Sequence, residues 1–160
     1  MQVRLRPVEP GHADFLLSLF LTARPDLHAL PRDIAAHQFR IQQEAYVRRF
    51  GGHGHSIVVI DGEPAGRLWT SGDATQIRIV DIMLLPQFRG IGAGTILVSD
   101  VLKHSQQVVL TVRRNNPAVR LYLRLGFQIS GGDELDLEMT WRDLAGSGRT
   151  SVRSLETNLT

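Results

Sequence analysis

The clearest pattern of hydrophobic and polar positions lies between residues 76 and 105, where an apolar run, a glycine-rich turn and an amphipathic segment follow one another. Nearly every one of residues 77–85 is apolar, on both alternating faces, which is typical of a strand covered on both sides. Pro86 cannot donate to a sheet ladder, so strand pairing is expected to stop there. Apolar positions within 93–104 recur at helical spacing. This stretch therefore predicts a central strand, a tight turn and a helix.

Weaker patterns predict the remaining elements. The predicted strands are 3–7, 56–60, 65–71, 108–112, 127–130 and 134–141, and the predicted helices are 11–23, 31–50 and 117–125. The first strand is expected at a sheet edge, and turns are expected at the Asp-Gly pair 61–62 and at 131–133. In the last strand Leu135, Leu137 and Met139 alternate with polar residues, so one face of it should contact water.

The composition fits a single globular domain. The chain has 160 residues, 42% of them hydrophobic, which is enough for one core. We expect a domain at 1–141 and a polar tail at 142–160, with residues 151–159 packed across a homodimer contact. The sequence has no signal-peptide pattern and no apolar run of about 20 residues, so we expect a cytoplasmic protein that does not enter a membrane.

Charge and special residues exclude several kinds of chemistry. The formal net charge is +2 and only 6% of residues are aromatic, so nucleic-acid binding is not favoured. The chain has no cysteine, so acyl transfer must be direct or use serine. His53 and His55 lie in a glycine-rich loop without a nearby carboxylate, so they are expected to face solvent and not a metal. We expect that no metal is required.

The turn after the central strand reads Arg89-Gly90-Ile91-Gly92-Ala93-Gly94 and is followed by Thr95. A strand, a glycine-rich loop and a helix N-terminus in this order direct several free N–H groups to one point, where the helix dipole favours a phosphate. A P-loop would need lysine, and the dinucleotide pattern would need glycine in place of Thr95. The R-x-x-G-x-G sequence resembles instead the acetyl-CoA loop of the GNAT superfamily of N-acetyltransferases.

A second motif, N-N-P-A-V-R-L-Y-L-R-L-G-F at residues 115–127, is similar to the other signature of that superfamily. Asn116 suits an N-cap, Pro117 the first helical position and Gly126 the position after the helix. Tyr122 shares the apolar face of this helix, so it is expected to point inward. The two motifs have the order and spacing of the superfamily, and a looser resemblance covers residues 3–141.

The resemblance implies an α/β fold with a mixed, mostly antiparallel sheet of six to seven strands, a V-shaped splay between the two central strands and about four flanking helices. It also implies that acetyl-CoA is the cosubstrate and that a primary amine of a small molecule or a protein is the acceptor. In the superfamily the tyrosine stands beside the CoA sulfur, and the asparagine contacts the pantetheine arm. The residues expected to contact acetyl-CoA are Ile82, Met83, Leu84, Arg89, Gly90, Ile91, Gly92, Ala93, Gly94, Thr95, Asn115 and Tyr122.

Transfer from a thioester to an amine needs an oxyanion donor, a proton for the leaving thiolate and a neutral amine. The resemblance implies that a bulge frees the oxyanion donor among the N–H groups of 82–84 and that Tyr122 donates the proton, the alternative being a core tyrosine. Asp81, inside the apolar strand, is the candidate base. Alternation puts Asp81 on the face of Ile79 and Met83, and the alternative is a buried aspartate that bonds backbone amides.

The leading hypothesis is a CoA-dependent N-acetyltransferase, and the alternative is a non-catalytic CoA-binding or protein-interaction module on the same fold. A third hypothesis, acetyl transfer onto charged tRNA, rests only on the arginines. Leu110 stands where relatives that acetylate ribosomal-protein N-termini carry a glutamate, which argues against their substrate. The helices at 11–23 and 31–50 are expected to wall the acceptor side. Their candidate substrate contacts, each with core packing or solvation as the alternative, are Phe39, Arg40, Tyr46, Arg48 and Arg49.

Overall fold

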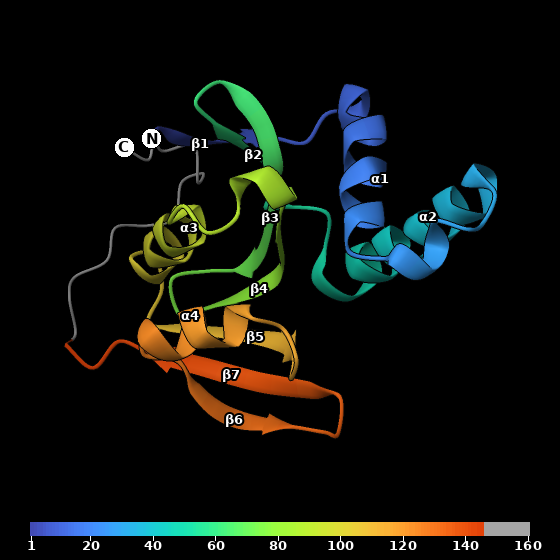
Figure 1. Ribbon diagram of the computed structural model, residues 1–160. Coiled ribbons are helices and arrows are strands. Elements are labelled where there is room, and N and C mark those ends of the chain that lie inside the picture. Colours follow the sequence, from blue (N-terminus) through green and yellow to red (C-terminus); the bar gives the residue numbers. More distant parts are fainter. Residues whose placement is uncertain (146–160) are drawn as a thin grey trace.

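The computed structural model describes residues 1–145, which form one seven-stranded sheet flanked by helices (Figure 1). The strands are β1 (Val3–Pro7), β2 (His55–Ile60), β3 (Glu63–Gly72), β4 (Gln76–Leu84), β5 (Gln107–Arg113), β6 (Gln128–Gly132) and β7 (Asp136–Arg142). The helices are α1 (Ala13–Thr22), α2 (Arg32–Phe50), α3 (Ala93–Leu102) and α4 (Ala118–Arg124), with short 3-10 turns η1 (Pro10–His12), η2 (Pro25–Leu27) and η3 (Pro86–Phe88). Among these residues no helix is long and apolar enough to cross a bilayer.

The strand order is β1-β2-β3-β4-β5-β7-β6, and every neighbouring pair is antiparallel except β4 and β5. This confirms the predicted mixed sheet, with β1 at an edge and β4 in the centre. The main core lies between one face of the sheet and the helices α3 and α4. The other face, over β2 and β3, packs against α1 and α2 (Figure 1). Successive residues of β2 show the two faces, because Val58 and Ile60 belong to the first core and Ile57 and Val59 to the second.

The two central strands separate partway along their length. The parallel ladder between β4 and β5 runs from the pair Gln76 and Gln107 to the pair Ile79 and Leu110. Both strands continue beyond that pair, β4 to Leu84 and β5 to its own end, without further pairing to each other within the described chain. The predicted V-shaped splay is therefore present, and it opens toward the carboxyl ends of both strands.

A β-bulge in β4 lies just beyond the point where the strands separate. Thr70 of β3 pairs with Ile79, whereas Trp69 pairs with Asp81, so Val80 is an extra residue in β4. Side chains of a strand alternate between faces, and one extra residue inverts that alternation. The prediction that Asp81 shares a face with Ile79 is therefore wrong, because Ile79 packs in the α3 core and the Asp81 side chain contacts Arg67 on the α2 face.

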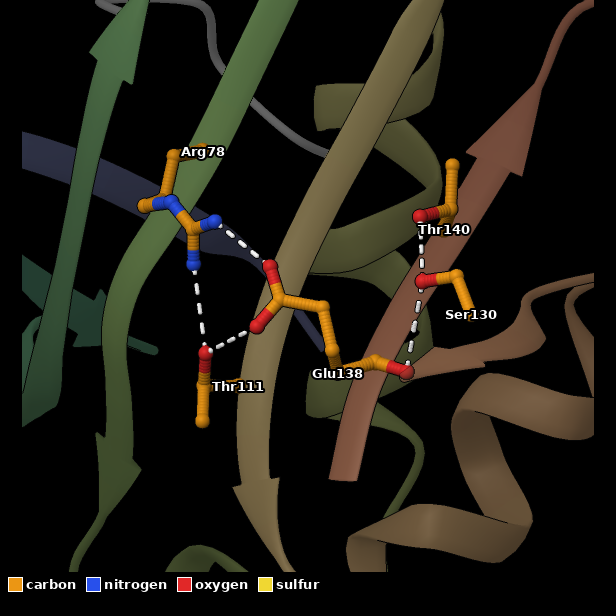
Figure 2. Close-up of polar contacts among 5 residues, drawn as sticks. All are labelled: Arg78, Thr111, Ser130, Glu138 and Thr140. Atoms are coloured by element: carbon orange, nitrogen blue, oxygen red, sulfur yellow. Dashed lines mark hydrogen bonds and ion pairs between the residues drawn. The ribbon is translucent and has the colours of Figure 1, made fainter. Parts of the chain in front are cut away.

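A polar network ties the three strands near the base of the splay (Figure 2). Arg78 of β4 donates from Nη2 to Glu138 Oε1 of β7 (2.7 Å) and from Nη1 to Thr111 Oγ1 of β5 (3.3 Å), and Thr111 donates to Glu138 Oε2 (2.8 Å). Burial acts to raise the pKa of Glu138, but the hydrogen bonds from Arg78 and Thr111 outweigh this effect and hold the pKa below its ordinary value. Beside this network the Ser130 and Thr140 hydroxyls are 2.8 Å apart. The face of β7 opposite the core is thus polar, as predicted.

Two local predictions at the end of the chain are wrong. The turn expected at 131–133 begins instead at Asp133, because β6 continues to Gly132 through an irregularity between Ile129 and Gly131. Glycine marks bulges as well as turns, so the sequence alone could not separate the two. Leu135 lies before β7 and is 62% exposed, so it is not part of the alternating apolar face. The predicted dimer contact at 151–159 lies outside the described residues.

Candidate active site

The glycine-rich loop joins η3 to α3 and exposes its backbone. Gly90 and Gly92 have φ angles of +73° and +91°, a region that favours glycine, and Gly92 is the N-cap of α3. A Cβ atom added at either position would meet nothing within 4 Å. The loop therefore faces open space on both glycines, and their lack of a side chain leaves the backbone accessible.

Six consecutive backbone N–H groups of this loop have no acceptor within the described part of the chain. The Arg89 N–H bonds the carbonyl of Pro86, and the Ile96 N–H bonds that of Gly92, while the N–H groups of residues 90–95 between them donate to no described atom. Free amides at the positive end of a helix dipole form a site for an anion. The loop geometry thus fits the diphosphate of acetyl-CoA.

Two arginines border the loop. Arg89 donates from Nε to the carbonyl of Leu84 (2.8 Å), which ties the loop to the end of β4. Arg124 of α4 reaches Thr95 in the first turn of α3, with 3.5 Å between Nη2 and Oγ1. Arg124 was not among the predicted contacts, because the sequence shows only that it lies on the exposed face of its helix. Its position adds a positive charge beside the free amides.

The second motif forms the turn into α4. Asn116 Oδ1 accepts a hydrogen bond from the N–H of Ala118, the first residue of α4 (2.9 Å), and Pro117, predicted as the first helical residue, is instead the N-cap. Asn115, the predicted pantetheine contact, is exposed between β5 and α4. The turn thus starts α4 next to the end of β5 that bounds the splay.

Tyr122 points into the core, as predicted, and is 4% exposed. Its ring packs against Phe127, with 5.5 Å between centroids. Burial, and secondly the charge of Asp81, raises its pKa to about 12. Its hydroxyl makes no hydrogen bond to any described residue. A buried phenol that stays protonated and has no partner can donate to a substrate atom.

The bulge also decides which backbone amides of β4 face the splay. The N–H of Leu85 donates to a carbonyl of β3 (2.8 Å). Backbone groups alternate in direction along an antiparallel strand, so Met83 and Asp81 also direct theirs to β3. The N–H groups of Ile82 and Leu84 point to the other side, where β5 has separated. Of the three predicted oxyanion donors, the geometry therefore favours Ile82 and Leu84 over Met83.

Asp81 forms an ion pair with Arg67 of β3. The Arg67 Nε donates to Asp81 Oδ2 (2.6 Å), and Nη2 contacts the same oxygen. Arg67 is 2% exposed, whereas the Asp81 side chain is 19% exposed. The alternative in which Asp81 bonds backbone amides is therefore not observed. Arg67 was not among the predicted site residues, although a lone arginine inside the apolar run 65–70 is a signal for a buried charge partner.

Aromatic side chains line the α2 face beside this pair. Tyr46 meets Trp69 edge-on, and the ring of His55 stacks on Trp69 at 4.3 Å. The prediction that His55 faces solvent is wrong, because the stacking half-buries it, and burial followed by the charge of Arg67 lowers its pKa to about 4. Phe39 packs against Phe20 and so belongs to the core. Residues 1–145 contain no group of three or more side chains that could hold a metal.

Known proteins resemble this chain in sequence and fold. A model of the Acetyltransferase (GNAT) family matches residues 16–127. The peptidyl-lysine N-acetyltransferase YjaB of Escherichia coli (strain K12) is 28% identical over 107 residues, 65% of this chain and 70% of that protein. An N-alpha-acetyltransferase of Sulfurisphaera tokodaii is 31% identical over 91 residues, 45% of this chain and 54% of that protein.

Among solved structures, the PaiA N-acetyltransferase of Thermoplasma acidophilum in complex with coenzyme A superposes with a TM-score of 0.64. The match covers 89% of this chain and 100% of that chain at 14% identity, which shows a shared fold. The family match covers both the glycine-rich loop and the Tyr122 helix. The chain belongs to the GNAT family of acetyltransferases.

Proposed function

We propose that the protein transfers an acetyl group from acetyl-CoA directly to a primary amine. The observation that carries the proposal is the run of six free N–H groups at 90–95, which opens beside the splay of β4 and β5. These amides and Arg124 would hold the diphosphate, and Arg89 would keep the loop against β4. The pantetheine arm would follow the splay past Asn115, which brings the thioester between β4 and Tyr122.

The residues around the splay would divide the chemistry. The amine nitrogen forms a bond to the thioester carbonyl carbon, the carbon–sulfur bond breaks, and its electron pair leaves on sulfur. The N–H of Ile82 or Leu84 would donate to the carbonyl oxygen as it gains negative charge. Tyr122 would donate its proton to the departing sulfur and regain one from solvent, while the nitrogen loses one to water or to Asp81. The chain has no cysteine to carry the acetyl group, and direct transfer, as proposed here, would require both substrates to be bound together.

Asp81 is the residue that would meet the amine. It lies beyond the last β4–β5 pair, and its side chain is on the α2 face, opposite the core face that holds Tyr122. The curated relatives act on two kinds of amine, since YjaB is named for lysine side chains and the Sulfurisphaera protein for α-amino groups. A protein or peptide amine is therefore the acceptor class that we propose.

Binding is tested by titrating acetyl-CoA in a calorimeter. Gly92→Asp would place a side chain and a negative charge at the amides and should abolish detectable binding. Gly51→Asp is the matched control, because Gly51 also has a positive φ (+83°) and open space around it but follows α2 on the other face of the sheet. The control should bind as the wild type does, and unchanged affinity in Gly92→Asp would remove the loop from the mechanism.

Turnover is tested by the release of free CoA. Because the chain has no cysteine, a thiol reagent reads only the released product. Two acceptors form the panel: a lysine-free pentapeptide amide with a free α-amino group, and its N-acetylated counterpart with one internal lysine. We expect turnover with at least one of them. Tight binding of acetyl-CoA without turnover of either peptide, or of a panel of small amines, would favour the non-catalytic CoA-binding module.

A further inference from the structure

We propose that Arg67 is a positioning residue, which fixes the Asp81 carboxylate by one oxygen so that the other oxygen receives the acceptor amine. This inference rests on the proposed function. Arg67 itself is buried at 2% exposure, so it cannot touch the acceptor. It acts only through the carboxylate that it holds.

Arg67 contacts only one of the two oxygens of the Asp81 carboxylate. Both Arg67 contacts, from Nε and from Nη2, end on Asp81 Oδ2. Asp81 Oδ1 has no hydrogen-bond partner within residues 1–145, and it is not among the buried unpartnered atoms, so it reaches an accessible surface. An ionised carboxylate can accept several hydrogen bonds, and here one of its two oxygens is left open.

The guanidinium is fixed from its far side by α2. Its Nη1 donates to Gln43 Oε1 (2.6 Å) and its Nη2 to Gln42 Oε1 (3.3 Å). Its central carbon lies 6.0 Å from the centre of the Trp69 ring. A buried arginine with unsatisfied donors is strongly destabilising, so these contacts hold the group in one orientation. The helix on the acceptor side is thereby coupled to the carboxylate on β4.

The ion pair between Arg78 of β4 and Glu138 of β7 lies on the same face of the sheet, and its carboxylate is bonded differently from that of Asp81. Glu138 is bonded on both oxygens, Oε1 by Arg78 and Oε2 by Thr111, so that carboxylate is filled and serves as a tie between strands (Figure 2). Asp81 lies beyond the last β4–β5 pair, whereas Arg78 lies within the paired part. The Asp81 carboxylate, which is bonded on one oxygen, thus lies at the open end of the splay, and the Glu138 carboxylate, which is bonded on both, lies at the closed end.

The test is a double-mutant cycle on kcat with the peptide of the panel that the wild type uses best. We expect Arg67→Met and Asp81→Asn each to lower kcat roughly ten- to a hundredfold, as for a misplaced reacting group. The double variant should be no slower than the slower single variant, because Arg67 acts through Asp81. The dissociation constant of acetyl-CoA should stay within about twofold in all three, since the donor loop is untouched.

Two controls separate positioning from folding. Arg78→Met and Glu138→Gln break the ion pair between β4 and β7 on the same face, and their effects on kcat should be small even where the melting temperature falls.

Gln43→Ala removes one anchor of the Arg67 guanidinium but leaves its ion pair with Asp81 intact, so it tests the inference if Arg67→Met does not fold. It should lower kcat by a few-fold, and Arg67→Lys should recover part of the loss in Arg67→Met.

Each outcome has one meaning. Losses in Arg67→Met and Asp81→Asn that multiply in the double variant, or full turnover in Asp81→Asn, overturn the positioning role while the wild-type turnover keeps the proposed function. Full turnover in Gln43→Ala overturns the coupling to α2. Absence of wild-type turnover with every amine, despite acetyl-CoA binding, overturns the proposed function and this inference with it.

Discussion

Burial and then the negative charge of Asp81 raise the pKa of Tyr122 to about 12, although the two side chains belong to opposite faces of the sheet. Asp81 lies beyond the last β4–β5 pair, in the part of β4 that β5 no longer flanks. In a closed sheet, paired backbone would fill that region. Under the proposed function, Tyr122 and Asp81 would act as an acid and a carboxylate on opposite sides of the splay, which is the arrangement that a reaction between two substrates needs.

Tyr122→Phe should lower kcat by roughly ten- to a thousandfold, the usual contribution of a positioned proton donor. The ring and its packing against Phe127 are kept, so the melting temperature and acetyl-CoA affinity should change little. Since the pKa of Tyr122 is raised to about 12, the wild type should show no loss of kcat from this group as pH rises from 7 to 10. Wild-type turnover in a folded Tyr122→Phe protein, with chemistry rate-limiting, would mean that water supplies the proton.

Arg124→Met should weaken acetyl-CoA binding by roughly three- to tenfold, because it removes a partly screened cation from the first turn of α3. The difference from the wild type should shrink in 0.5 M salt, because the Debye length falls from about 10 Å at 0.1 M salt to roughly 4 Å. Arg120→Met is the matched control, since Arg120 is exposed on the same helix and makes no side-chain contact with α3 in the described chain. Equal affinities for both variants would exclude Arg124 from the phosphate site.

His55 should make the fold less stable in acid. Its pKa is about 4 in the folded protein and 6.5 when unperturbed, so the unfolded chain binds more protons below pH 6.5. The stability that the neutral imidazole provides is complete above pH 6.5 and is lost as the pH falls toward 4. Melting temperatures between pH 7.5 and 4.5 should therefore fall less in His55→Phe, which keeps a ring on Trp69, than in the wild type. His53→Gln is the control and should follow the wild-type curve.

The elements that carry the donor site could be predicted because they depend on local signals. Glycines at a strand-to-helix turn, a capping asparagine and an apolar helical face each act over a few residues, so the loop at 90–95 and the inward direction of Tyr122 follow from the sequence. The start of α3 at Ala93 and the whole of β1 were predicted to the residue. Superfamily motifs added the order in which these elements meet.

The acceptor side could not be predicted in the same way, because it depends on pairing between distant strands. No local pattern marks Val80 as an extra residue, since it is one valine in an apolar run, and its effect appears only in the register against Trp69 and Thr70. The partner of Asp81 lies 14 positions earlier on another strand. The glycines before His55 are typical of a loop, and its burial follows only from its stacking on Trp69. The bulge at Val80, the partner of Asp81 and the burial of His55 are all determined by strand register and tertiary contacts, and not by local propensity.

The extra residue in β4 changes the face of the sheet on which each later side chain of the strand lies. Every position downstream of Val80 is displayed on the face that its predecessor would otherwise have occupied. If β4 kept Val80 but paired with β3 without the bulge, Val80 would oppose Trp69, the Asp81 carboxylate would turn to the α3 face, and the amides of Ile82 and Leu84 would point to β3. The faces of β4 beyond Ile79 therefore depend on one irregularity in its pairing with β3, and not on the composition of the strand.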